Sequence, residues 1–383
     1  MTARALPGLP DAADADGFGT PLTTFAGLSA VPGGPGAKLG WIRTRADDFR
    51  REFAATGTPD RISTHDLVTL PYPTRFGLFR ATKSPAPFLT ITNRMLVIRW
   101  TETDGRKRTL LFEPSDVELG RNTPYFAALA RKTPDALEKL MVKSNPSVGE
   151  HLAGLGIRPE DVDYLLFDHL HTQDLRRWVG TTTEQPDLGG RVEPFFPNAR
   201  LIVQRDEIAA MQQLHPLQRP WYQEGHFEDL RPEAVLAIDG GVLLGPGVAV
   251  LPTPGHVFGN QTLMLNTSTG IWASSENAIA AECLTPEHSK LPGVRRWTRE
   301  WRQEVVLNAN SLETTADQYN SLVLEKCVVD RSQTDSRFLQ FFPSSELTAH
   351  WLSPGTRPTF THRSITHHAN GARMTSSKDT PTW

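Results

Sequence analysis

The sequence predicts an α+β protein in which two β-sheets pack together with helices outside. Near the start of the body, two β-rich runs separated by a tight-turn signal predict an antiparallel pair. Further along, helical segments and short apolar strands alternate. With 383 residues, of which 38% are hydrophobic, the chain can also bury a large core.

The antiparallel pair is predicted from the segments 88–100 and 108–112, which flank Asp104-Gly105. Asp-Gly is a strong hairpin signal because both residues can adopt a positive φ. A capping-box pattern, Ser147-Val-Gly-Glu150, then predicts the start of a helix that ends before Gly156. The body of the domain therefore begins with strands and continues into a helix.

The remaining helices and strands are predicted from apolar runs and from the turn residues that bound them. Helices are expected at 206–213 and, from the spacing of Trp297, Trp301 and Val305, across 297–305. Short strands are expected at 164–167, 199–204, 247–251, 263–265, 271–273 and 338–342.

The two ends of the chain differ from its body. Residues up to about 40 are rich in Ala, Gly, Pro and Asp and predict a mobile or loosely docked arm, whereas Thr, Ser, His and Arg dominate from Ser353 onward. We expect an N-terminal extension at 1–58, partly flexible, one domain at 59–352, and a flexible C-terminal tail at 353–383.

Charge and composition restrict the partners. The net charge of −3 supplies no basic excess for a nucleic acid or for a membrane surface. Two cysteines cannot build a disulfide framework, and neither a signal peptide nor a run of about 18 apolar residues is present. We expect a cytoplasmic protein with a small-molecule substrate; its oligomeric state, a homodimer included, stays open.

Metal-binding side chains follow several of the predicted strands. His169 and His171 come directly after the strand at 164–167, His256 lies in a Thr-Pro-Gly-His turn after the strand at 247–251, and Glu276 follows the strand at 271–273. Functional sites collect where strand ends meet loops. The pattern favours a metal site over histidines that merely pack at strand ends.

The segment 155–171, Leu-Gly-Ile-Arg-Pro-Glu-Asp-Val-Asp-Tyr-Leu-Leu-Phe-Asp-His-Leu-His, resembles the approach to the signature of the metallo-β-lactamase-fold hydrolases. The resemblance continues through 196–204, 215–222 and 246–256, covers about 65–350, and points to the lactonase-like branch. It implies a four-layer αββα sandwich with a one- or two-metal site at the sheet edge. His169, His171 and His256 match the three histidines of the first metal site.

The second metal site departs from the family pattern. The family has His-x-His-x-Asp-His, whereas here Gln173 stands in place of the aspartate and Asp174 in place of the last histidine. Glu276 matches the bridging aspartate, and Ser345 matches a further histidine ligand. The resemblance therefore implies one divalent metal, with zinc expected first and iron or manganese as alternatives; a second metal stays open.

Roles follow for the neighbouring residues. Asp174 and Glu276 are candidates both for ligation and for proton transfer in catalysis, although Asp174 equally suits the first turn of a helix. We expect Asp168 to orient a ligand histidine rather than to bind metal. His215 and Tyr222 are candidates for substrate contact, with plain loop packing as the alternative.

Three functions compete. The first is a metallohydrolase that uses metal-bound hydroxide on an ester, lactone or thioester carbonyl. The second is a mononuclear iron oxygenase of the persulfide dioxygenase type, with His169, His256 and Glu276 as ligands. The third is a non-catalytic binding descendant of the fold.

Overall fold

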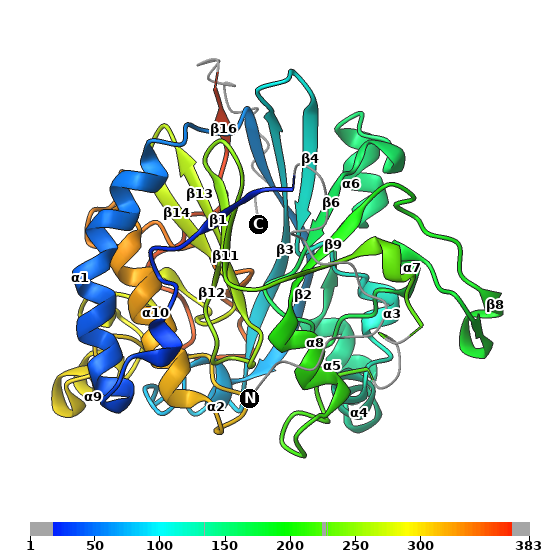
Figure 1. Cartoon of the computed structure of the whole chain (residues 1–383). Coiled ribbons are helices and arrows are strands. Elements are labelled where there is room, and N and C mark those ends of the chain that lie inside the picture. Colours follow the sequence, from blue (N-terminus) through cyan, green and yellow to red (C-terminus); the bar gives the residue numbers. More distant parts are fainter. Residues whose placement is uncertain (1–17, 134, 224–226, 228, 370–383) are drawn as a thin grey trace.

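Two β-sheets pack against each other and carry helices on their outer faces (Figure 1). The computed structural model describes residues 18–133, 135–223, 227 and 229–369. Within these residues the predicted α+β, four-layer αββα sandwich is confirmed. The helices α1, α9 and α10 lie on one side of the two sheets, and α6, α7 and α8 lie on the other.

The smaller sheet has five antiparallel strands in the order β1-β11-β12-β13-β14. Their bounds are β1 Thr20–Leu22, β11 Gly241–Gly245, β12 Val248–Pro252, β13 Gln261–Thr267 and β14 Gly270–Ser274. Because alternate strands of an antiparallel sheet run in the same direction, β12 and β14 end at the same edge.

The larger sheet has the order β10-β9-β6-β4-β3-β2-β16, with β15 paired to β3 and β5 to β2. The strands β4, β6, β9 and β10 are parallel, and the other pairs are antiparallel. The bounds are β2 Arg61–Pro73, β3 Phe88–Thr101, β4 Lys107–Phe112, β5 Lys143–Ser144, β6 Tyr164–Leu166, β9 Arg200–Gln204, β10 Val235–Ile238, β15 Ser345–Thr348 and β16 His367–His368; β7 Glu184–Gln185 pairs separately with β8 Gly190–Arg191. The hairpin β3–β4 turns at Gly105, whose φ is 86°.

The helices complete the two outer layers. Their bounds are α1 Gly34–Ala54, α2 Thr74–Gly77, α3 Val117–Gly120, α4 Pro124–Lys132, α5 Asp135–Met141, α6 Val148–Gly154, α7 Arg176–Val179, α8 Arg205–Gln212, α9 Val294–Trp301 and α10 Thr315–Val328. The predicted capping box is present at Ser147 and Glu150 and begins α6.

The strands bury side chains on both of their faces. Val248 and Val250 of β12 pack between the sheets, whereas the intervening Ala249 joins the cluster beneath the helices. Leu110 and Leu111 of β4 divide in the same way. Burial of each such aliphatic side chain contributes about 1.5–3 kcal/mol, which explains why strands covered on both faces read as apolar runs.

The described parts of the predicted extensions belong to the sandwich, which corrects the prediction of a loose arm and tail. Helix α1 buries Ile42, Phe49 and Phe53 and packs along α10. Near the other end, Ile365 is buried and β16 pairs with β2. Residues 1–17 and 370–383 of the extensions lie outside the described residues. The domain bounds at 59 and 352 stay a prediction.

One other predicted element is confirmed only in part, and another is wrong. The helix at 297–305 ends at Trp301 because Arg302 takes a left-handed φ of 53°, and Val305 is buried in the following loop. The segment 338–342 forms isolated bridges rather than a strand. Its phenylalanines contribute to the core without a continuous ladder.

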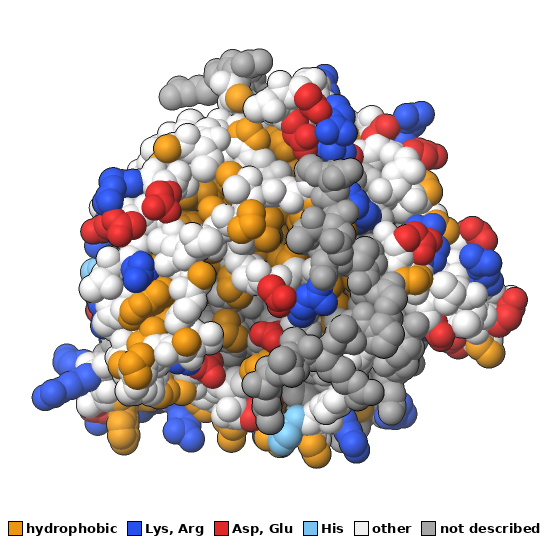
Figure 2. All heavy atoms as spheres, in the orientation of Figure 1, with side chains coloured by type: hydrophobic (Ala, Val, Ile, Leu, Met, Phe, Trp, Pro, Cys, Tyr) orange, Lys and Arg blue, Asp and Glu red, His pale blue; other side chains and the backbone are white. Residues whose placement is uncertain are grey.

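The described surface of the protein and its two cysteines do not indicate a binding partner. Figure 2 shows hydrophobic side chains gathered over the middle of one face, with acidic and basic side chains spread around them. Cys283 and Cys327 are both free thiols. Among the described residues, no helix is long and apolar enough to cross a bilayer.

Candidate metal centre

Loops that follow three strands converge at one edge of the sandwich. The loop after β6 carries His169 and His171, the loop after β12 carries His256, and the loop after β14 carries Glu276. The two sheets are joined at this point, because the backbone N–H of Gln261 donates to the carbonyl of Asp168 over 2.8 Å.

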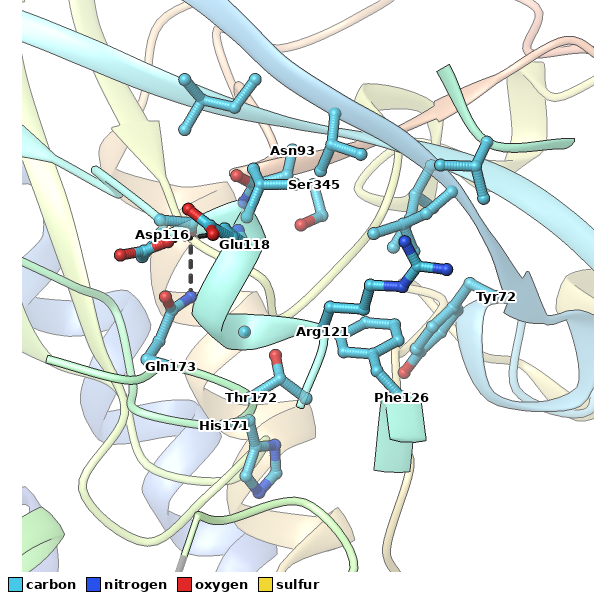
Figure 3. Close-up of a pocket in the computed structure, with 18 of the residues that line it drawn as sticks. Tyr72, Asn93, Asp116, Glu118, Arg121, Phe126, His171, Thr172, Gln173 and Ser345 are labelled. Atoms are coloured by element: carbon cyan, nitrogen blue, oxygen red, sulfur yellow. Dashed lines mark hydrogen bonds between the residues drawn. The ribbon is translucent and has the colours of Figure 1, made fainter. Parts of the chain in front are cut away.

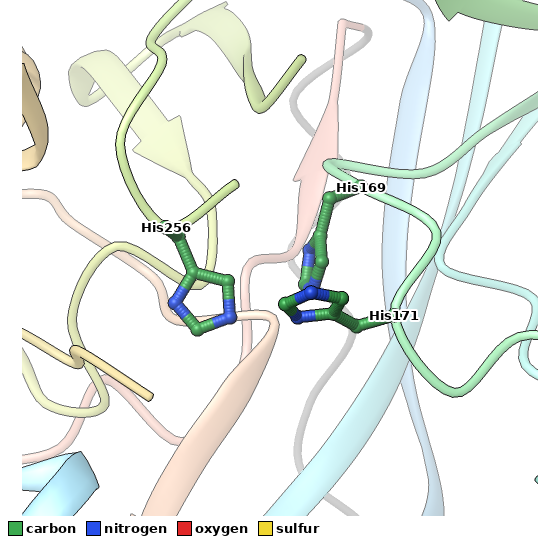
Figure 4. A group of neighbouring side chains, drawn as sticks. All are labelled: His169, His171 and His256. Atoms are coloured by element: carbon green, nitrogen blue, oxygen red, sulfur yellow. The ribbon is translucent and has the colours of Figure 1, made fainter. Parts of the chain in front are cut away.

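The three predicted histidines form a compact, buried group (Figure 4). One ring nitrogen from each lies within 4.8 Å of the others. The ring centroids of His169 and His256 are 4.6 Å apart, and those of His169 and His171 are 4.8 Å apart. Each side chain is at most 5% exposed. The structure therefore brings together the three residues that the His-x-His and Pro-Gly-His motifs indicate.

Hydrogen bonds on the far side of each ring fix the tautomers. His256 Nδ1 donates to the carbonyl of Asn308 over 2.7 Å, and His169 Nδ1 donates to a carboxylate oxygen of Asp168. His171 Nε2 lies 2.6 Å from Gln218 Oε1, and the amide nitrogen of Gln218 donates to Ser311. The nitrogens on the other side of each ring are therefore His169 Nε2, His171 Nδ1 and His256 Nε2, and of these His171 Nδ1 accepts from the side-chain amide of Asn310 over 3.1 Å.

Electrostatics keep two of these rings neutral. Burial and the charge of His169 lower the pKa of His256 to about 3, and burial also lowers the pKa of His171 well below its usual range. For His169, burial opposes protonation, but the Asp168 carboxylate raises the pKa to about 9. Neutral imidazoles with oriented lone pairs are the form in which histidine binds metals.

This donor set fits a divalent metal. Three imidazole nitrogens with one open side are the ligand pattern of catalytic zinc sites, and each ring carries the supporting hydrogen bond that such ligands usually make. Asp168 has the orienting position expected for it, since its other oxygen accepts from Ser344 over 2.7 Å. The roles of all these residues as ligands remain proposals.

Glu276 borders the open side. One carboxylate oxygen lies 3.9 Å from His169 Nε2, and the backbone carbonyl accepts from Asn308 Nδ2. Burial raises the pKa of Glu276 to about 7, while His169 and the hydroxyl of Ser345 act in the opposite direction. The predicted carboxylate is therefore adjacent to the histidines.

The structure does not bring Asp174 to this group. Both oxygens of Asp174 accept from the guanidinium of Arg176, at 3.0 and 2.7 Å, and the pair is buried. Arg176 also binds Asp187 and Gln185. The structure therefore places Asp174 in an ion pair with Arg176 and outside the group of three histidines, and its roles in ligation and proton transfer stay predictions.

His215 and Tyr222 also lie away from the open side. His215 is exposed, and its Nδ1 accepts from the backbone N–H of Leu217. The Tyr222 ring packs against His171, with centroids 4.7 Å apart, and its hydroxyl donates to Glu207 over 2.7 Å. Tyr222 thus packs against His171. Neither His215 nor Tyr222 lines the pocket that lies over the three histidines.

Three supporting residues have no signal in the sequence. Gln218, Asn308 and Asn310 contact the ring nitrogens of His171 and His256 from loops that lie 47–139 positions away along the chain. Only the tertiary fold brings these amides and carbonyls to the rings.

A pocket of about 540 Å³ opens over the histidines (Figure 3). Glu276, Gln173 and Ser345 border it at the metal-site end. In the view of Figure 3, Tyr72 and Phe126 lie on the opposite side from Gln173. Apolar side chains from β2, α4 and α5 form part of the remaining walls, namely Leu67, Val68, Leu70, Leu129 and Met141, and charged side chains also line them, among them Glu118, Arg121 and Glu138.

No family model matches the chain. The chain is similar to an N-acyl homoserine lactonase from a Bacillus species, with 31% identity over 122 residues, and to one from Bacillus cereus, with 30% identity over 118 residues. Each match covers 30% of this chain and 38% of the relative's length. A solved dizinc quorum-quenching lactonase with bound product aligns over 79% of this chain and 94% of its own, at 10% identity and a TM-score of 0.47.

The chain matches little more than a third of the length of each curated relative. The activity of these relatives is therefore not transferred directly to this chain. The predicted resemblance is confirmed: the chain is similar to the lactonase-like branch of the metallo-β-lactamase-fold hydrolases.

Proposed function

We propose that this protein is a metal-dependent hydrolase that cleaves an ester or lactone bond in a small molecule carrying an apolar acyl chain. The observation that carries the proposal is the convergence of three imidazole rings, from His169, His171 and His256, at one end of the pocket. A divalent cation there would lower the pKa of bound water to about 7 and polarise a carbonyl.

The chain's own residues would position the reaction. Glu276 faces the same end of the pocket and receives a hydrogen bond from Ser345. We assign its carboxylate the role of accepting a proton from the attacking water, because no other carboxylate of the described residues borders both the pocket and the three rings.

The apolar walls support an acyl substrate. Leu67, Leu129 and Met141 supply an apolar part of the pocket wall, whereas Glu118, Arg121 and Glu138 place charged groups elsewhere on the lining. A volume of about 540 Å³ is within the range of pockets for small molecules. The likeness to N-acyl homoserine lactonases supports a lactone with an acyl chain as the first substrate to test.

The first prediction concerns hydrolysis. Purified protein should cleave N-acyl lactones or aryl esters, with a preference for medium-length over acetyl chains, and should lose this activity on treatment with a chelator. Glu276→Gln should lower kcat by about 10²–10⁴-fold, the usual contribution of a general base, while keeping its metal. The measurements are substrate hydrolysis and metal content by mass spectrometry.

Exposed Glu300→Gln is a matched control and should leave kcat unchanged. Full hydrolysis by Glu276→Gln would contradict the assigned role. Bound iron together with thiol-dependent oxygen uptake, without hydrolysis, would replace the proposed function by an oxygenase.

A further inference from the structure

We infer that the chain holds one divalent cation at this centre and not two. The inference rests on the proposed metal-dependent function and concerns the side chains that stand where the resemblance implies a second metal. These are Gln173, Asp174, Glu276 and Ser345. Three of these side chains, Asp174, Gln173 and Ser345, make contacts with other residues of the protein.

Asp174 already forms an ion pair with the buried guanidinium of Arg176. Arg176 donates to both carboxylate oxygens of Asp174, and the Arg176 side chain is only 7% exposed. The guanidinium also donates to Gln185 and Asp187. Ligation of a metal by Asp174 would leave this buried guanidinium with fewer partners. Breaking a buried ion pair by removing one partner costs several kcal/mol, so the pair holds Asp174 away from the centre.

Gln173 and Ser345 offer neutral oxygens only. The amide of Gln173 donates to Ser115 over 3.0 Å, which fixes its orientation at the wall of the pocket. Ser345 donates to Glu276. Neither side chain supplies the negative charge or the imidazole nitrogen with which a second zinc or manganese ion would be bound.

The remaining donors cannot form a separate site. Among the described residues, a second group of metal-competent side chains is Asp168, His169 and Glu276, but it shares His169 with the first group. Asp168 is further engaged by His169 Nδ1 and Ser344. Because both groups contain His169, they form a single site, and we infer that its one cation is held mainly by the three imidazoles.

The test is the stoichiometry of the full-length protein. Metal-stripped protein is dialysed against Zn²⁺ or Co²⁺, and bound metal is measured by mass spectrometry; the Co²⁺ absorbance should saturate at one equivalent per chain. Two tightly bound equivalents would overturn the inference and leave the proposed hydrolase intact. No bound metal would overturn both.

Two variants test the cause. Asp174→Asn should bind the same single equivalent with unchanged affinity, whereas a loss of metal would overturn the inference. The double variant Gln173→Asp/Ser345→His supplies a carboxylate and an imidazole and should take up a second equivalent. If the folded double variant still binds one, these two positions are not what limits the site. Circular dichroism verifies folding, and His256→Ala provides the control that loses the first equivalent.

Discussion

His171 shows how a ligand is prepared by a residue that carries no recognisable motif. Its Nε2 faces the Gln218 carbonyl oxygen at 2.6 Å, and Gln218 is itself held by hydrogen bonds from its amide nitrogen to Ser311 and Glu313. This arrangement leaves Nδ1 without a proton, so that it accepts from the side-chain amide of Asn310 over 3.1 Å. Such a supporting hydrogen bond fixes both the tautomer and the ring orientation.

Replacement of this support should weaken metal binding without removing a ligand. We expect Gln218→Leu to lower Zn²⁺ affinity about 10–100-fold, as is typical when the partner of a ligating histidine is lost. Competition with a chromophoric chelator measures the change. Ser311→Ala, which keeps the Gln218–His171 contact, should have a smaller effect. Equal affinity in Gln218→Leu and the wild type would show that Gln218 does not orient the ring.

At the scale of elements, the loop of His256 depends on a close contact with helix α10. Gly255 has a φ of 142°, and a Cβ atom there would lie 2.0 Å from the Cα of Gln318. Gln318 in turn donates to the carbonyl of Asn308, which also accepts from His256 Nδ1. The loop after β12 can therefore approach α10 only with glycine at this position.

Gly255→Ala should consequently displace His256 as well as destabilise the fold. We expect a loss of about 1–3 kcal/mol in the free energy of unfolding, from overpacking and backbone strain, together with reduced metal occupancy. Denaturant unfolding and metal analysis provide the two readouts. Gly40→Ala in α1, which meets no atom within 4 Å, should be neutral or stabilising. Wild-type metal content and stability in Gly255→Ala would rule out this account.

At the scale of the whole molecule, a buried carboxylate joins helix α10 to the smaller sheet and to the metal-site loop. One oxygen of Glu325 accepts from Thr262, Ser275 and Asn277, which lie on β13 and beside Glu276. Its other oxygen has no hydrogen-bond partner among the described residues. Burial raises the pKa of Glu325 to about 7, and the three donors only partly oppose this.

The raised pKa makes the stability of the fold depend on pH. Because Glu325 binds its proton more tightly in the folded state than at the ordinary pKa of 4.5, its contribution is complete below pH 4.5 and is lost as pH rises through about 7. Glu325→Gln has no such loss. Its stability relative to the wild type should improve by on the order of 3 kcal/mol, (7 − 4.5) × 1.36, between pH 4.5 and 8.

Urea unfolding of both proteins at several pH values measures this difference. The exposed variant Glu300→Gln serves as the control, and its offset from the wild type should stay within about 0.5 kcal/mol at every pH. A Glu325→Gln offset that is flat with pH would contradict the ionisation argument.

The sequence predicts those elements whose signals are local. The Asp-Gly hairpin, the capping box at Ser147 and the buried strand before His169 all appear where expected, since each depends on neighbouring residues. Helix α1 was obscured by its glycines and proline, although Ile42, Phe49 and Phe53 follow a helical spacing. The segment 338–342 is apolar because it is buried, not because it forms a strand.

The sequence by itself predicted the sandwich class and the grouping of the three histidines, because strand-end motifs and apolar runs consist of contiguous residues. Only the tertiary structure decided what Asp174 and Gln173 do. A carboxylate in the chain is a potential ligand until its partners are known, and the partner that occupies Asp174 is the buried guanidinium of Arg176. The orientation of each histidine likewise depends on acceptors from distant loops, which no local pattern encodes.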